Sequence, residues 1–98
     1  MMSTHDFKEK LMQWRSKAQQ AKHPFELKQQ LMHFFSVADD KFIIAKIDKK
    51  LLDDLCAVYY SIQSIEAFPD SHVREYLFRI CIDRTLIIFE EMVQHCDN

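Results

Sequence analysis

The chain has 98 residues, a formal net charge of −2 and a hydrophobic content of 48%. This length suits one domain and is too short for two, so we expect residues 1–98 to form a single domain. The chain contains no glycine. Because tight hairpin turns and phosphate-binding loops both depend on glycine, the composition excludes a sheet of several hairpins and a glycine-rich nucleotide site. It predicts an all-α protein.

The first half of the chain predicts two amphipathic helices, over about residues 4–21 and 24–38. In the first, the apolar residues recur at spacings of three and four, which is typical of one buried helix face. His23 and Pro24 separate the two helices, because the residue before a proline is pushed away from helical geometry and proline suits the first helical position. The apolar residues of the two segments are Phe7, Leu11, Trp14, Ala18 and Ala21, then Phe25, Leu27, Leu31, Phe34 and Phe35.

A third helix is expected over about residues 40–67, since apolar residues continue at helical spacing from Ile44 to Ile65. Within it, Asp48 marks a point where the helix could kink or restart. Phe68-Pro69-Asp70-Ser71 is a clear break, and Asp70 or Ser71 can cap a fourth helix over about residues 71–95. Four helices with short connections predict an antiparallel four-helix bundle.

The fourth helix has two apolar sides when its residues are placed 100° apart. Its broad side is the expected core side and comprises Leu77, Phe78, Cys81, Ile82, Ile88, Phe89 and Met92. A second, thin apolar strip comprises Tyr76, Ile80 and Ile87, and charged residues of both signs flank it: Arg79, Asp83, Arg84 and Glu91. Two interpretations remain open, because such a strip is typical of a contact surface for a partner helix and also of a central helix with neighbours on both sides.

Charge is distributed unevenly along the chain. Residues 1–28 hold six basic and three acidic residues, a balance of +3, so the remainder carries −5. Lys8, Arg15 and Lys22 are spaced seven apart and are expected to share one helix face. Such a face could bind nucleic acid or another anionic surface, but it is more often simply solvated, and a sequence pI near 6.2 argues against a nucleic-acid partner.

The sequence contains no catalytic or metal-binding signature, so we expect no enzyme activity, no cofactor and no metal. Glu91 and His95 are four apart and, with His72, are the only residues we weighed for a metal or small-ligand site, but the Glu-x-x-His pattern of di-iron bundles is absent. Cys96 adjoins His95 yet projects about 100° away from it, so the two are poorly placed as nucleophile and base. Tyr60 falls outside the apolar stripe of the third helix, beside Cys56, and is a second candidate contact point.

These features favour a small regulatory or adaptor module that binds another protein, or a second copy of itself as a homodimer, without catalysis. An inhibitor or immunity protein, an antitoxin and a secretion-type chaperone all fit this description. Binding of nucleic acid or an anionic surface through the basic face is the first alternative, and a metal or small ligand within the bundle is the second. Three cysteines, charged residues near the N-terminus and no apolar run of about 20 residues predict a cytoplasmic protein without a membrane span.

Overall fold

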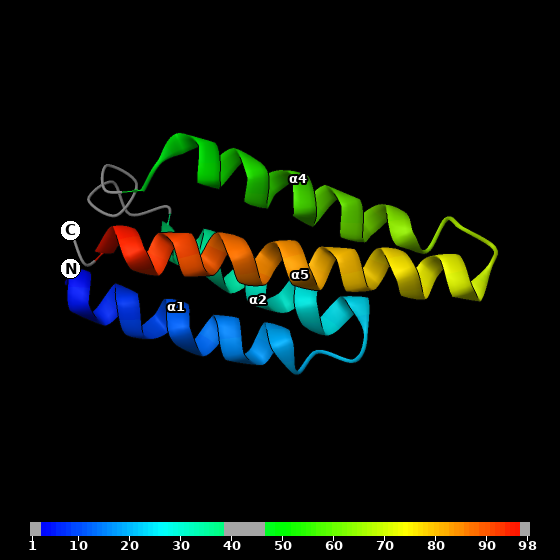
Figure 1. The fold of residues 1–98 in the computed structure, drawn as a ribbon, viewed down its shortest axis with the longest axis horizontal. Coiled ribbons are helices and arrows are strands. Elements are labelled where there is room, and N and C mark those ends of the chain that lie inside the picture. Colours follow the sequence, from blue (N-terminus) through cyan, green and yellow to red (C-terminus); the bar gives the residue numbers. More distant parts are fainter. Residues whose placement is uncertain (1–2, 39–46, 97–98) are drawn as a thin grey trace.

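The computed structural model describes residues 3–38 and 47–96, which form four helices and no strands. The helices are α1 (Thr4–Gln19), α2 (Pro24–Ala38), α4 (Lys49–Ile65) and α5 (Ser71–Cys96). Each helix runs antiparallel to the next one along the chain, so that α1 begins and α5 ends at the same end of the bundle (Figure 1). The predicted antiparallel four-helix bundle is therefore confirmed.

Short polar side chains start three of the helices, as their sequence positions indicate. Ser3 accepts a hydrogen bond from the backbone N–H of Asp6, and Asp48 accepts one from that of Lys50. Asp70 accepts bonds from the N–H groups of His72 and Val73, at 2.7 and 3.2 Å. Each of these bonds satisfies an N–H group that has no partner within its own helix, which fixes where the helix begins.

Two helices differ in extent from their approximate predicted ranges. The first helix ends at Gln19, two residues before the predicted end, and the backbone N–H of Lys22 in the connection donates to the Glu26 carboxylate of α2. The expected helix over 40–67 begins only at Lys49, with Asp48 in an extended conformation as its cap, and it ends at Ile65. Asp48, which the sequence marked as a point of kink or restart, is the N-cap of α4, and residues 40–46 lie outside the described part of the chain.

The helices form a ring in which α1 packs on α2, α2 on α4, α4 on α5 and α5 on α1. The interfaces of α5 with α1 and with α4 are the most extensive, and that of α2 with α4 is the least. Phe34 on α2 lies at the centre of the core, with its ring 5.9 Å from that of Trp14 and 5.7 Å from that of Phe89. Aromatic side chains from three helices thus meet in one cluster that holds the ring together.

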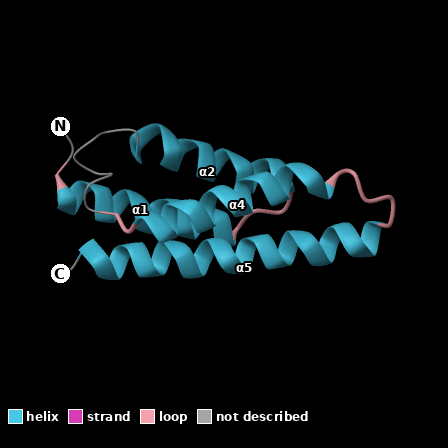
Figure 2. Cartoon of the chain, turned by 90° about the horizontal axis from the view of Figure 1, so that it is seen from above, coloured by secondary structure: helices cyan, strands magenta, loops and turns pink. Residues whose placement is uncertain are grey.

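The hairpin of α4 and α5 projects beyond the hairpin of α1 and α2, as both views show (Figures 1 and 2). Helix α5 has 26 residues and α1 has 16, which correspond to about 39 and 24 Å of helix at 1.5 Å per residue. The two helices are level at the end where the chain's termini lie, so the overhang is at the connection between α4 and α5. The first turns of α5 therefore have α4 beside them and no cover from α1 or α2.

Candidate protein interface

Helix α5 uses one side for the core, and this side is largely the predicted one. Phe78, Cys81, Ile88, Phe89 and Met92 are buried, while Leu77 and Ile82 are half-buried. Two further core residues, Thr85 and Val93, were not predicted from the sequence. Thr85 is completely buried and its hydroxyl donates to the carbonyl of Cys81 at 2.8 Å. Its place midway between Cys81 and Ile88, at helical spacing, is the signal that could have revealed it.

The thin strip on the opposite side of α5 is exposed. Tyr76 is 66% exposed, Ile80 36% and Ile87 59%. We call these three residues the outer strip. The alternative interpretation, that the strip is internal to the bundle, is thereby ruled out for the isolated chain. Large apolar side chains grouped on one helix face are atypical of a surface that only meets water, since single exposed apolar residues are common but clusters are not.

Charged side chains border the outer strip, and the structure brings the predicted ones to it. Arg79, Asp83, Arg84 and Glu91 are all exposed. Arg79 lies 3.8 Å from Glu75, one turn earlier on the same helix. A charged rim around apolar anchors is the usual anatomy of a protein-binding patch, in which the centre contributes affinity and the rim contributes orientation.

A groove of about 420 Å³ runs along one border of the strip, between α4 and α5. Its lining includes the buried residues Val58, Ile65 and Cys81, the small exposed residues Ala57, Ser61 and Ser64 of α4, and Leu77 and Ile80 of α5. The hydroxyl of Ser61 donates to the carbonyl of Ala57 at 2.9 Å, and that of Ser64 to the carbonyl of Tyr60 at 3.1 Å. Because these hydroxyl protons are already used within the helix, the α4 side of the groove makes little demand for polar partners.

The tip of the hairpin closes one end of this groove. Phe68, which is 43% exposed, lines it there. The guanidinium of Arg74 donates to the carbonyls of Phe68 and Pro69, at 2.6 and 2.9 Å, and so fixes the connection between α4 and α5. At the opposite end the groove is lined by Asp54 and Arg84. The outer strip and the groove thus form one continuous face of the α4–α5 hairpin.

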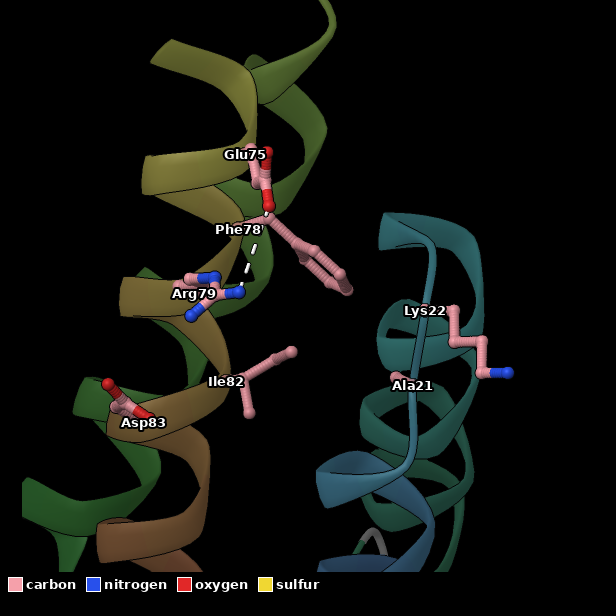
Figure 3. A pocket seen from close by; sticks show the side chains of 7 residues that line it. All are labelled: Ala21, Lys22, Glu75, Phe78, Arg79, Ile82 and Asp83. Carbon is pink, nitrogen blue, oxygen red and sulfur yellow. Dashed lines mark ion pairs between the residues drawn. The ribbon is translucent and has the colours of Figure 1, made fainter. Parts of the chain in front are cut away.

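A second hollow, of about 490 Å³, lies on the other border of the strip, between α5 and the connection from α1 to α2 (Figure 3). Phe78 and Ile82 point across it toward Ala21, whereas the Lys22 side chain points away from α5. Glu75 and Arg79 pair with each other at its rim. The charged groups of this hollow are thus on its rim and its interior is apolar. Like the adjoining outer strip, it combines apolar residues with a charged border.

Sequence reasoning missed another exposed apolar area, over α2 and α4. Phe25 is 65% exposed and Met32 50%, although Phe25 was grouped with the apolar residues of its helix. Tyr60 is 65% exposed, as expected, and Tyr59 is half-buried with its ring 6.0 Å from that of Phe35. The sequence contained a signal for this exposure, because Phe25 and Met32 are seven residues apart and both lie outside the core stripe of α2. A charged residue lies beside this area, since Nζ of Lys28 is 5.6 Å from the centre of the Tyr59 ring.

The three residues of the proposed basic face are not on one helix. Lys22 follows the end of α1 and lies in the connection to α2. Arg15 is half-buried, with its Nε 3.3 Å from the Glu90 carboxylate on α5, and Lys8 is half-buried near the start of α1. The seven-residue spacing predicts a shared face only within one helix, and α1 ends at Gln19, about one turn before Lys22.

The chemical groups weighed for catalysis or metal binding are spread over the surface. Glu91, His95 and His72 are exposed, and the described residues contain no group of three His, Cys, Asp or Glu side chains that could hold a metal ion. Cys81 lies in the wall of the α4–α5 groove and is buried. Burial raises the pKa of its thiol above the ordinary value of 9.0, an effect that the nearby Arg84 guanidinium partly offsets.

The chain matches no known protein family, no curated protein and no solved structure. Within residues 3–38 and 47–96, no helix has the length and apolarity that a membrane span needs. Function must therefore be inferred from the surfaces of this chain itself.

Proposed function

We propose that this chain is a small interaction module that binds another protein through the outer strip of α5 and acts by occluding or presenting a surface, without catalysis. The observation that supports this most directly is the exposure of Tyr76, Ile80 and Ile87 on a helix whose other apolar side is already committed to the core. A helix that only closes the bundle would need one apolar side. A second apolar side, the outer strip, is expected if it packs against a partner protein.

The energetics are adequate for a specific contact. Moving a large apolar side chain from water into a packed interface contributes about 1.5–3 kcal/mol. Three such anchors from one strip could therefore dominate a binding free energy, as buried aromatic and aliphatic residues do in known interfaces. Arg79, Asp83, Arg84 and Glu91 would set the orientation of the partner, because rim charges act more on specificity and association rate than on affinity.

The proposal covers adaptors, inhibitors, antitoxins and secretion-type chaperones, which share this mechanism of surface binding. We place its action in the cytoplasm, where the three cysteines would stay reduced. A second copy of the chain remains one of the partners to be tested. Nucleic acid is a less favoured partner than a protein. Of the residues predicted to form a basic face, Lys22 lies beyond the end of α1 and Arg15 is paired with Glu90.

Replacing Ile80 and Ile87 together by Asp tests the proposal. We expect the double variant to keep the circular dichroism spectrum and the cooperative unfolding of the native chain, because neither side chain belongs to the buried core. We also expect it to lose the protein that the native chain captures from extracts of its own cells. A double variant that captures the same protein equally well would contradict the proposal, as would one that unfolds outright.

A further inference from the structure

On the basis of the proposed function, we infer that the groove between α4 and α5 receives a basic amphipathic helix of a partner protein, whose apolar side packs on the outer strip and the groove lining. Three observations carry this inference: the shape of the groove, the composition of its walls, and the sign of the charge around it.

The groove is long enough to receive about three turns of a docked helix. Its lining on α4 extends from Asp54 to Ile65, the last residue of that helix, which is about 16 Å at 1.5 Å per residue. The small side chains of Ala57, Ser61 and Ser64 let a third helix approach the backbone of α4, and Ile80 would pack between its turns. This is the ridge-into-groove arrangement by which helices recognise one another.

The charge of the face determines what kind of helix fits. From residue 48 to residue 96 the chain carries nine acidic and five basic residues, a balance of −4, whereas residues 3–38 carry three acidic and six basic residues, a balance of +3. Close to the groove and strip, four acidic residues face two basic ones, a balance of −2. The Arg79–Glu75 ion pair takes up one charge of each sign, and the groove lining itself holds one of each, Asp54 and Arg84. The four acidic residues are Asp54, Glu75, Asp83 and Glu91.

The same charges argue against a second copy as the occupant. A twofold dimer through this face would place two acidic surfaces against each other, which costs free energy. A head-to-tail contact between the acidic hairpin of one copy and the basic hairpin of the next would leave both end surfaces open and would continue into a filament. A basic helix from another protein would cause neither repulsion between acidic surfaces nor assembly into a filament.

Three synthetic 18-residue peptides test the inference, with their binding followed by fluorescence anisotropy. The first carries Leu at helical spacing and Lys on its other side, the second has Glu in place of every Lys, and the third is a scrambled form of the first. We expect the first peptide to bind at least tenfold more tightly than either of the others. We also expect its affinity to fall as the salt concentration rises, because part of the attraction is between exposed charges.

A matched pair of variants localises the binding. Ser61 lines the groove, and Gln63 is exposed on another side of the same helix. Ser61→Phe should lower the affinity for the basic peptide tenfold or more by filling the groove, and Gln63→Phe should leave it unchanged. Both residues are exposed, so neither variant is expected to lose the fold.

Several outcomes would overturn the inference. They are equal binding of the basic and acidic peptides, no binding of the basic peptide, insensitivity to Ser61→Phe, or a dimer in light scattering that Ile80→Asp dissociates. None of these would by itself remove the proposed function, because capture of a partner protein by the native chain and its loss in the Ile80→Asp, Ile87→Asp double variant are measured separately. Failure of that capture would end both.

Discussion

Arg15 on α1 and Glu90 on α5 lie against each other, with Nε of the guanidinium 3.3 Å from Oε2 of the carboxylate. This ion pair joins the basic hairpin of the bundle to the acidic one. Arg15 is the middle residue of the basic face predicted from the sequence, so the pair neutralises that residue. Glu90 lies on the border of α5 opposite the α4–α5 groove.

The pair should contribute little to stability. Its side chains are 39% and 50% exposed, so water and salt screen the attraction, and we expect a coupling energy of about 0.2–1 kcal/mol. A double-mutant cycle with Arg15→Ala and Glu90→Ala, followed by urea denaturation, measures it. A coupling well above this range would mean that the two hairpins are held together by charge and not by the apolar core.

Two adjacent residues of α5 offer a direct contrast between strip and core. Ile87 is 59% exposed and Ile88 is 6% exposed. We expect Ile87→Asp to lower the free energy of unfolding by less than about 1 kcal/mol, whereas Ile88→Asp, which buries an unpaired charge, should cost more than about 3 kcal/mol or unfold the chain. Equal losses in urea denaturation would show that the outer strip belongs to the core.

We expect the methyl group of Thr85 to contribute more to the free energy of unfolding than its hydroxyl does. The hydroxyl bonds to a helix carbonyl at 2.8 Å, and that carbonyl keeps its backbone partner if the hydroxyl is lost. Thr85→Val should therefore change the free energy of unfolding by no more than about 1 kcal/mol, and Thr85→Ser, which leaves a small cavity, should lower it by about 1 kcal/mol. A larger loss in the valine variant would reverse this assignment.

Cys81 should react slowly and should make stability depend on alkaline pH. Because burial raises the pKa of its thiol in the folded chain above 9.0, the unfolded chain loses the proton first, and the free energy of unfolding should fall as the pH rises past 9. We expect Cys81→Ala to remove this part of the decline. Iodoacetamide at pH 8 should label the half-buried Cys56 faster than Cys81, and labelling of Cys81 at the rate of Cys56 would contradict the burial.

Local signals made much of the fold predictable. Pro24, Asp48 and Asp70 act on the residues next to them, so their effects can be inferred from sequence spacing alone. The outer strip was also visible, since 100° per residue separates Ile80 and Ile87 from the core side of α5. That this strip faces solvent could not be known, because exposure depends on which helices lie beside α5.

The remaining features depend on relations between helices. The α4–α5 groove exists because small residues of α4 come opposite Ile80 and Leu77, a register that the sequence does not fix. The ion pair of Arg15 and Glu90 likewise joins residues far apart in the chain. The start of α4 at Lys49, in contrast, has a local cause, because Asp48 caps it and the sequence marked this residue as a point of kink or restart.

The most direct test of the central claim is covalent capture in the cells that make the protein. A photo-crosslinking amino acid is placed at Ile87 on the outer strip, and in a matched variant at Gln13, an exposed position among charged residues on α1. Our account predicts a discrete cross-linked product with another protein from position 87, and none from position 13. Products of equal yield from both positions, or none from position 87, would contradict the assignment of the outer strip as a binding surface.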